Sequence, residues 1–321
     1  LVKFFYLLLN LIGADIVRQE IYPLYENMLK DSEPEVRSLA VSKLSDIFEY
    51  LTQDQIVESL VPTLSVLARD PSIHVRLAVS NLMPKLFASL SEEPLLKYVL
   101  PIIQHLVKDE MIDVRVTTIQ NLSVIYEKLS LSSLQSHLVP LLTSAHKEKN
   151  WRYRNAIVEN IPKICKVIGW EAFDRTLKPY LLQFLKDHYY PIREQAIKSI
   201  SEVIQVVGFE NFREDLINSL NELANHSNYL FRMTSLLAIA ELYTYFPYQT
   251  FCDIFDSLLR KLGSDKIANV RQKLLETIQV LYKHFQREYF ENKIIPLINL
   301  LRNDPDSEVS YLSEKVYREI S

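Results

Sequence analysis

The feature that most constrains this chain is a repeat: side chains of one type recur every 39 residues, without insertion or deletion, along its 321 residues. A period of roughly 20 to 50 residues is typical of solenoids, propellers and other arrays. The clearest member is an arginine, called here the arginine ladder: Arg37, Arg76, Arg115, Arg154, Arg193, Arg232 and Arg271, with Ser310 in the last copy. The residue before each of these positions is large and apolar. The sequence therefore predicts one structural unit, repeated.

Two further positions follow the same period. The position six residues before the arginine, called here the acidic position, is occupied by Asp31, Asp70, Asp109, Glu148, Asp187, His226, Asp265 and Asp304. A proline recurs as Pro23, Pro62, Pro101, Pro140, Pro179 and Pro296, with Asn218 and Ser257 in the other two copies. Because charged, apolar and proline positions share one period, what recurs is an arrangement of whole structural elements and not a local motif.

Each unit is predicted to contain two helices. In residues 53–91, apolar side chains fall three and four apart on both sides of the Asp70-Pro71 break, which predicts helices over about 53–68 and 73–90. Asp70 and Ser72 lie where short polar side chains can cap the second helix. Three of the four glycines, Gly13, Gly169 and Gly208, share the position that ends the second helix, where a left-handed residue is useful.

A single helix pair cannot cover its own apolar stripe, whereas stacked pairs bury each other's. The predicted fold is therefore all-α: one continuous right-handed α-solenoid of antiparallel helix pairs over residues 1–321, without separate globular domains. The scarcity of glycine, four residues in 321, agrees with helices joined by short turns. Residues 1–14 are predicted to be the second helix of a truncated repeat, followed by repeats over about 15–52, 53–91, 92–130, 131–169, 170–208, 209–247, 248–286 and 287–321.

Composition excludes several classes of function. The formal net charge of −4 gives no global attraction to nucleic acid or to an anionic membrane, so we expect neither as a partner. The apolar N-terminal stretch resembles a secretory signal, but Asn10 interrupts it and the repeat explains it better. The histidines show no metal-ligand spacing, and phosphate loops and nucleophile motifs are absent. We expect no cofactor, no metal and no enzymatic activity, and we expect Cys165 and Cys252 to be buried and inert.

The stretch Asn150-Trp151-Arg152-Tyr153-Arg154 poses a choice between nucleic-acid binding and another function, because it interleaves aromatic rings with arginines. Its position in the repeat separates the five residues. Arg154 belongs to the ladder and Tyr153 to the buried position before it, whereas Trp151 and Arg152 are surplus to the repeat. Large aromatic and arginine side chains are enriched in interface hot spots, so an exposed protein contact is expected here.

The arginine ladder and the acidic position admit a catalytic interpretation, since acids and bases recur close together. Eight copies of one arrangement describe a scaffold better, because an active site is normally unique. We expect each ladder arginine to bridge adjacent repeats through bidentate hydrogen bonds to an acidic position. The candidate structural residues are Arg37, Arg76, Arg115, Arg154, Arg193, Arg232 and Arg271 with Asp31, Asp70, Asp109, Asp187 and Asp265.

The unit, with proline in its first helix and Asp…Val-Arg at its turn, resembles the HEAT repeat. The segments KNWRYRNAIVENIPKI, LKDHYYPIREQA, SNYLFRMTSL, DKIANVRQKL and DPDSEVSYLSEKV resemble, in order and spacing, the last five repeats of the scaffold (A) subunits of protein phosphatase 2A. The resemblance covers the whole chain and is most specific between Trp151 and Asn269. It implies that the chain is the C-terminal part of a longer solenoid.

The resemblance also implies a function: a non-catalytic scaffold that holds the phosphatase catalytic subunit and positions it relative to a regulatory B-type subunit, which would dock on earlier repeats. The residues implied to contact the catalytic subunit are Trp151, Arg152, Tyr190, Tyr229, Ile267 and Asn269. Asn150 departs from the family, which usually has lysine directly before the tryptophan. The implied location is the cytoplasm, with the nucleus as a second one. The alternative is a transport adaptor of the karyopherin class, although those proteins have less regular repeats.

Overall fold

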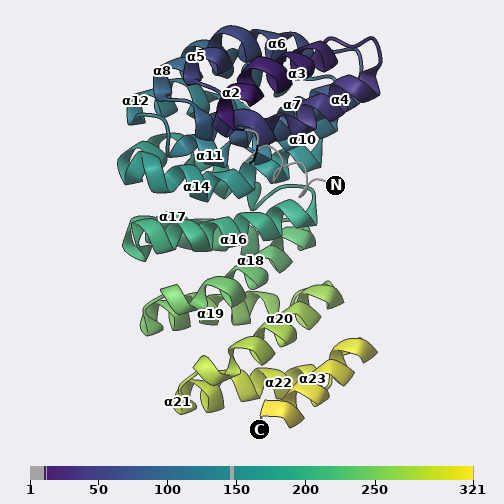
Figure 1. Cartoon of the computed structure of the whole chain (residues 1–321). Coiled ribbons are helices and arrows are strands. Elements are labelled where there is room, and N and C mark those ends of the chain that lie inside the picture. The colour runs from purple at the N-terminus through teal and green to yellow at the C-terminus, as the bar shows by residue number, and fades with distance from the viewer. Residues whose placement is uncertain (1–10, 12, 145–147, 321) are drawn as a thin grey trace. The chain divides into compact units, whose positions relative to one another are not determined.

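The structure is a computed structural model that describes residues 11, 13–144 and 148–320. Within these residues the regular structure is helical and contains no strand. The chain divides into two compact units, unit 1 (residues 1–172) and unit 2 (residues 173–321). Figure 1 shows their helices.

In unit 1 the first helix of each repeat is made of short consecutive segments. These segments are α2 (Ala14–Ile16), η1 (Val17–Ile21) and α3 (Tyr22–Leu29); α5 (Gln53–Gln55), η3 (Ile56–Leu60) and α6 (Val61–Leu67); α8 (Glu92–Pro94), η4 (Leu95–Val99) and α9 (Leu100–Leu106); and α12 (Leu131–Ser133), η5 (Leu134–Leu138) and α13 (Val139–Ser144). The second helices are α4 (Pro34–Lys43) with η2 (Leu44–Tyr50), α7 (Ile73–Ser89), α10 (Ile112–Gln120) with α11 (Ser123–Tyr126), and the part of α14 (Trp151–Thr176) that precedes Gly169, where the backbone is not helical.

The recurring proline explains the segmented first helices. Each of the four segments η1, η3, η4 and η5 is one π-helical turn that ends two residues before the proline. Proline has no N–H to donate and its ring crowds the carbonyl one turn back, so the helix widens ahead of it. The proline position thus marks a local irregularity that every repeat of unit 1 shares.

Unit 2 has both kinds of first helix. Its elements are α15 (Lys178–Phe184), α16 (Tyr190–Val207), α17 (Phe209–Ala224), α18 (Tyr229–Leu242) with η7 (Tyr243–Tyr245), α19 (Tyr248–Leu262), α20 (Ala268–Leu281) with η8 (Tyr282–His284), α21 (Arg287–Tyr289) with η9 (Phe290–Ile294) and α22 (Ile295–Leu301), and α23 (Ser307–Ile320). Where Asn218 and Ser257 replace the proline, α17 and α19 are unbroken. Where Pro296 is present, the π-helical turn returns.

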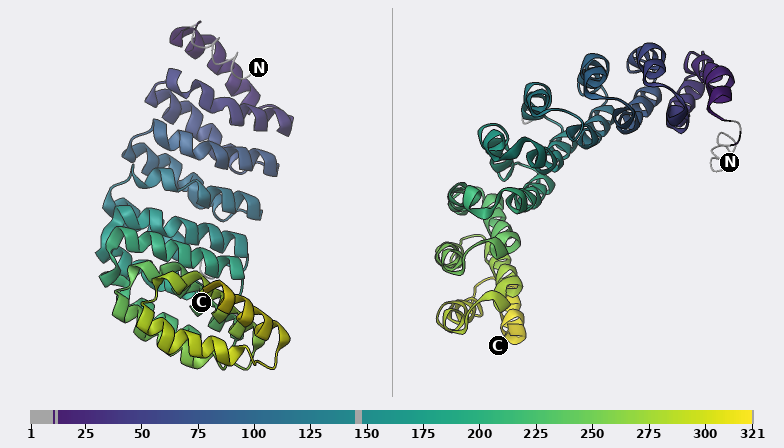
Figure 2. Two further views of the ribbon diagram at one scale, coloured as in Figure 1. Left: turned by 90° about the horizontal axis from the view of Figure 1, so that it is seen from below. Right: turned by 60° about the vertical axis from the view of Figure 1, so that its left-hand side comes forward.

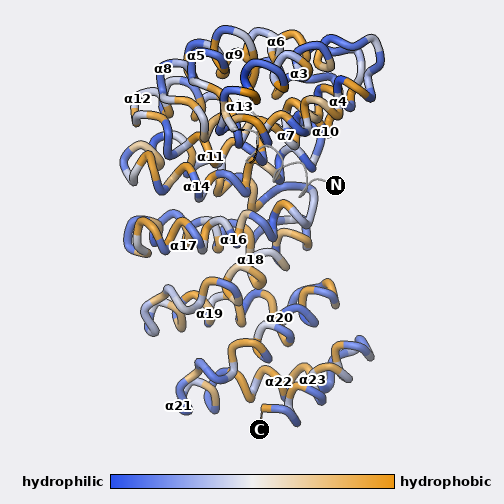
Figure 3. The backbone as a smooth tube through the Cα atoms, in the orientation of Figure 1, coloured by the Kyte–Doolittle hydropathy of each residue, from blue (hydrophilic) through white to orange (hydrophobic). Residues whose placement is uncertain are grey.

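Within each unit the helix pairs stack into two layers, the first helices in one and the second helices in the other (Figure 2). In unit 1, α7 packs between α4 and α10; in unit 2, α18 packs between α16 and α20. The apolar faces meet between the layers, whereas the turns at the ends of the helices are hydrophilic (Figure 3). The core therefore runs along each stack instead of closing around one centre.

Gly13, Gly169 and Gly208 all have a positive φ, between 75° and 84°. Their ψ angles, 161°, 172° and 150°, lie outside the left-handed helical region, in a region that glycine alone enters readily. Gly208 ends α16 and begins α17 without an intervening loop. The glycine thus allows a direct reversal between repeats, and the positive φ confirms the predicted left-handed residue at this position.

The predicted helices over about 53–68 and 73–90 match the observed 53–67 and 73–89. The predicted half-repeat over residues 1–14 lies largely outside the described residues. The continuity of one solenoid over residues 1–321, its hand and its repeat boundaries stay predictions. Cys165 and Cys252 are buried, as predicted.

Candidate protein-interaction site

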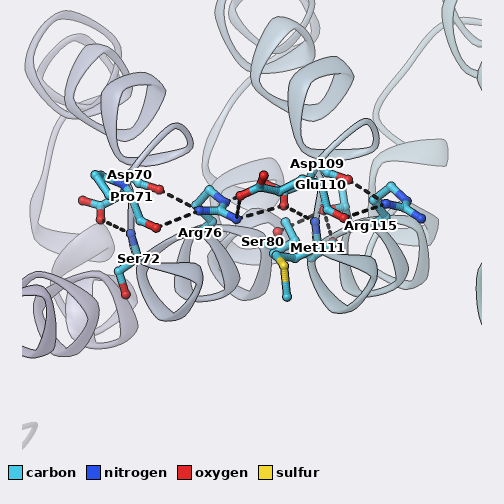
Figure 4. Close-up of polar contacts among 11 residues, drawn as sticks. Asp70, Pro71, Ser72, Arg76, Ser80, Asp109, Glu110, Met111 and Arg115 are labelled. Carbon is cyan, nitrogen blue, oxygen red and sulfur yellow. Dashed lines mark hydrogen bonds and ion pairs between the residues drawn. The ribbon is translucent and has the colours of Figure 1, made fainter.

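The turns within the repeats are built on the arginine ladder, and Arg76 in α7 shows how (Figure 4). Its Nε donates to Asp109 Oδ2 at 2.7 Å and its Nη2 to Asp109 Oδ1 at 3.1 Å, from one repeat to the next. Its Nη1 donates to the carbonyl oxygens of Asp70 and Pro71 in its own turn, at 2.8 and 3.2 Å. One guanidinium therefore fixes the turn of its own repeat and joins that repeat to its neighbour.

The same set of bonds recurs in both units. Arg37 pairs with Asp70, Arg232 with Asp265 and Arg271 with Asp304, each through Nε and Nη2 at 2.6 to 2.9 Å. In all eight repeats the side chain at the acidic position also accepts a hydrogen bond from the backbone amide two residues later. This local bond holds the carboxylate where the arginine of the preceding repeat reaches it.

The pKa values agree with this geometry. Burial alone would raise the pKa of the Asp70 carboxyl, but the bonds from Arg37 and from the Ser72 amide outweigh it and lower the pKa below its ordinary value. The pKa values of Asp265 and Asp304 are lowered by the same opposition of causes. These carboxylates stay charged inside the stack because an arginine meets them there.

Two ladder positions depart from this arrangement, those of Arg115 and Arg193. Arg154 holds its own turn as the others do, donating through Nη1 to the carbonyl oxygens of Glu148 and Lys149. Arg115 meets Glu148 through Nη2 at 3.7 Å, and its buried Nε has no hydrogen-bond partner. Arg193 faces His226 at the acidic position and donates through Nε to Thr234 Oγ1 at 2.9 Å. For Arg115 and Arg193 the expected bidentate pairing was therefore wrong, because glutamate is one methylene longer and histidine offers no pair of acceptor oxygens.

The residues expected to contact a partner lie at the starts of second helices. In unit 1, Trp151 is the first residue of α14 and is 37% exposed. In unit 2, Tyr190 begins α16 and is 52% exposed, and Tyr229 begins α18 and is half-buried. Ile267, directly before α20, is half-buried, and Asn269 in that helix is exposed. The structure brings the four unit 2 residues to successive turns of one stack.

The sequence suggested that Arg152 is surplus to the repeat, but the structure pairs it with a residue of the preceding repeat. Its Nη1 lies 2.7 Å from Oδ1 of Asp113, the residue 39 positions earlier, and each side chain is 47% exposed. Asn150, which departs from the family pattern, accepts a hydrogen bond from the Arg152 amide through its side chain and so caps α14. The start of α14 is thus an organised surface before any partner binds.

Sequence reasoning missed two exposed side chains on these turns. Tyr189 precedes Tyr190 and is 48% exposed, and Met111 precedes α10 and is 39% exposed. The HYYP segment contains Tyr189, but only Tyr190 stands at the repeat position that Trp151 and Tyr229 also occupy. Met111 gave no signal, because its counterparts in the other turns are mostly polar.

Other kinds of site find no support in the part of the chain that the structure describes. Across residues 11, 13–144 and 148–320 there is no group of three histidine, cysteine or acidic side chains that could hold a metal ion. A search of the same residues for a helix with the length and apolar character of a membrane span found none.

Comparisons with known proteins place the fold. Models of three families match different parts of the chain: a PPP2R1A-like HEAT repeat at residues 14–90, a PIK3R4-like middle domain at residues 89–248, and the TPR repeats of a dynein axonemal assembly factor 5-like protein at residues 179–321. A search of curated proteins gave no significant match. The three family models agree that the chain is built of helical repeats, but they belong to three different families.

Solved structures give the same answer. The chain is similar to Kap121p, with 14% identity and a TM-score of 0.65 over 92% of this chain and 33% of that one. It is similar to Kap95p bound to RanGDP (13% identity, TM-score 0.55, 94% and 42% covered) and to Cex1p (15%, 0.55, 93% and 52%). The chain thus spans between a third and about half of these proteins. The fold is an all-α HEAT-repeat solenoid.

Proposed function

We propose that this chain is a non-catalytic scaffold that holds the catalytic subunit of a serine/threonine phosphatase of the 2A type on the turns of its C-terminal repeats. The observation that carries the proposal is the set of aromatic side chains at one position of the repeat: Trp151 in unit 1 and Tyr190 in unit 2 are exposed, and Tyr229 in unit 2 is half-buried. Rigid aromatic anchors beside arginine are the typical hot spots of protein interfaces. The PPP2R1A-like match at residues 14–90 supports the same family.

The mechanism would be templating. Six of the seven ladder arginines hold their turns through two carbonyl oxygens and Arg271 through one, so the anchors stand on a rigid support and lose little freedom when a partner binds. Holding a catalytic subunit and a regulatory subunit on one support raises their effective concentration for each other. Under this proposal the chain has no active site of its own and works in the cytoplasm, and also in the nucleus.

The test is binding of the purified phosphatase catalytic subunit to this chain, measured by calorimetry. Trp151→Ala should weaken binding by about 2 kcal/mol, roughly 30-fold, as the loss of a central aromatic anchor does. Its melting temperature should change little, because Trp151 is partly exposed at a helix start.

The matched control is Tyr98→Ala, because Tyr98 is 38% exposed but lies on a first helix, away from the turns. Its affinity should equal that of the unchanged chain. Equal losses of affinity in the two variants, or no binding of the catalytic subunit at all, would reject the scaffold proposal.

The alternative is a transport adaptor, which the likeness to Kap121p and Kap95p favours. Solved structures hold Kap95p with RanGDP and Kap121p with RanGTP. Binding of this chain to Ran in either nucleotide state, together with no binding to the phosphatase catalytic subunit, would support the adaptor over the scaffold.

A further inference from the structure

We propose that Arg193 is a receptor for a carboxylate of the bound partner: an aspartate or glutamate side chain of the partner enters between the turns at residues 185–189 and 225–228 of unit 2. The partner meant here is the phosphatase catalytic subunit, so the inference rests on the proposed function. It names the chemistry of one contact in that interface.

The first ground is the missing internal partner. Four ladder arginines donate from Nε and Nη2 to the two oxygens of an aspartate in the next repeat. For Arg193, Nε goes to Thr234 Oγ1 and Nη1 to the carbonyl oxygens of Asp187 and His188. Within the described residues, Nη2 of Arg193 donates no hydrogen bond and no carboxylate forms an ion pair with this guanidinium.

The second ground is that His226 cannot take over the role of the aspartate. Its Nδ1 accepts a hydrogen bond from the Asn228 amide at 3.0 Å, and its ring packs edge-on against Phe231 with the centroids 4.6 Å apart. An imidazole in this position offers no oxygen pair to the guanidinium. The acidic position is thus filled, but without negative charge.

The third ground is burial. Arg193 is only 3% exposed, and the rings of Tyr190 and Phe231 each lie with their centroids 5.6 Å from the guanidinium carbon. Burial lowers the pKa of Arg193, whereas bonds to an aspartate raise those of Arg37, Arg76 and Arg271. The charge of Asp187 opposes this lowering, but Asp187 forms no ion pair with the guanidinium and burial prevails. A buried cation without a paired carboxylate is costly, so a carboxylate from outside gains more here than at a solvated arginine.

The position of this cation selects a protein partner. Tyr189 and Tyr190, which are both about half exposed, stand beside it on the turn where the proposed interface lies. A single acidic side chain that reaches past these rings to Nη2 would match its charge. Aromatic contacts would surround the ion pair and exclude water from it.

The experiment uses two substitutions of His226 that differ in charge. His226→Asp supplies the carboxylate from within the chain, so the melting temperature should rise by about 2 °C or more. The affinity for the purified phosphatase catalytic subunit should fall about tenfold, because Arg193 is then occupied. His226→Asn keeps an acceptor for the Asn228 amide without the charge and should leave the affinity unchanged.

Arg193→Gln should lower the affinity by a similar factor and reduce its dependence on salt. If His226→Asp raises the melting temperature but binds the catalytic subunit as tightly as His226→Asn, Arg193 does not receive a partner carboxylate and the inference is wrong.

A second measurement needs no partner, so that failure of the proposed function can be told apart. Sodium acetate, as the smallest carboxylate, should raise the melting temperature of the unchanged chain more than sodium chloride does at the same ionic strength. The difference should vanish in His226→Asp and in Arg193→Gln. An acetate effect without catalytic-subunit binding would support the receptor and reject the named partner, and the lack of any acetate effect would overturn the receptor itself.

Discussion

Two junctions between repeats use the same arginine position and differ in what the arginine meets. Between α7 and α10 of unit 1, Arg76 meets the buried carboxylate of Asp109 with two hydrogen bonds. Between α16 and α18 of unit 2, Arg193 meets one hydroxyl, that of Thr234. Both arginines nevertheless hold the carbonyl oxygens five and six residues upstream in their own turns.

The ladder arginine has two tasks, to fix its own turn and to join two repeats, and these two junctions separate them. Fixing the turn needs only the arginine and the backbone, since it persists where the carboxylate is absent. Joining the repeats needs the carboxylate, or else packing. At the α16 and α18 junction that packing comes from fully buried side chains such as Ile200 and Ile239. One junction is therefore joined by charge and packing, and the other by packing and one hydrogen bond to a neutral hydroxyl.

The largest difference should appear when each arginine is replaced by glutamine. Arg76→Gln leaves the Asp109 carboxylate buried, with 7% exposure, and without a counter-charge, which should cost about 3 kcal/mol of stability. Arg193→Gln removes a buried cation that had no carboxylate and should cost about 1 kcal/mol, for the lost bonds to its turn. Urea denaturation followed by circular dichroism measures both.

Hydrogen exchange provides the local control, because stability in a solenoid is roughly a sum of repeat and interface terms. Arg76→Gln should raise exchange in α7 and α10 above that in α16 and α18, and Arg193→Gln the reverse. Equal losses of stability in the two variants would show that the carboxylate adds nothing to the junction.

A smaller difference is expected in acid. Burial tends to raise the pKa values of Asp70, Asp265 and Asp304, but the arginine bonds prevail and hold these pKa values below their ordinary range in the folded chain. A carboxyl with a lowered folded pKa stabilises the fold above its unfolded pKa, and this stability is lost as the pH falls through the lowered value. The junctions with a carboxylate should therefore loosen below about pH 4, which hydrogen exchange at a series of pH values measures.

Asp70→Asn serves as the control for the acid effect. It should be less stable than the unchanged chain near neutral pH, and its exchange in α4 and α7 should depend less on pH below about 4. The same acid dependence in Asp70→Asn as in the unchanged chain would remove Asp70 as its source.

Much of the fold could be predicted because it is periodic. The apolar spacing fixed the helices at 53–67 and 73–89 to within a residue at each end. The π-helical turns were not predicted, although the sequence shows their cause, a proline at a fixed position of the repeat. The ψ angles of Gly169 and Gly208 were also out of reach, because a sequence indicates that a residue needs freedom and not which conformation it adopts.

The site was predictable where it follows the repeat and not elsewhere. The sequence predicted that arginine and acid bridge adjacent repeats. The geometry adds that Arg76 pairs with the aspartate of the following repeat, Asp109, and bonds only the backbone of its own turn. The pairing of Arg152 with Asp113 was visible in principle, since the two stand 39 residues apart. That Thr234 receives the Arg193 bond depends on side-chain packing that no sequence pattern records.

The smallest expected effect concerns the Arg115 junction in unit 1, where the arginine meets a carboxylate but at a longer distance than Arg76 does. Arg115 has a buried Nε without a partner and lies 3.7 Å from Glu148, whereas aspartates at the same position bond their arginines at 2.6 to 2.7 Å through Nε. Because the local bond to the backbone amide two residues later is the same in both cases, the extra methylene of glutamate is the difference. Glu148→Asp should let the carboxylate reach both Nε and Nη2 and satisfy the orphaned donor.

The expected gain from Glu148→Asp is about 1 kcal/mol, the usual net value of one buried hydrogen bond, seen as a higher urea midpoint and slower exchange in α10. Glu148→Gln, which keeps the length and removes the charge, should lose stability instead. If Glu148→Asp brings no gain, the spacing of the two backbones sets the 3.7 Å separation. The difference between this junction and that of Arg76 would then arise in the packing of α10 against α14 rather than in the side chain at residue 148.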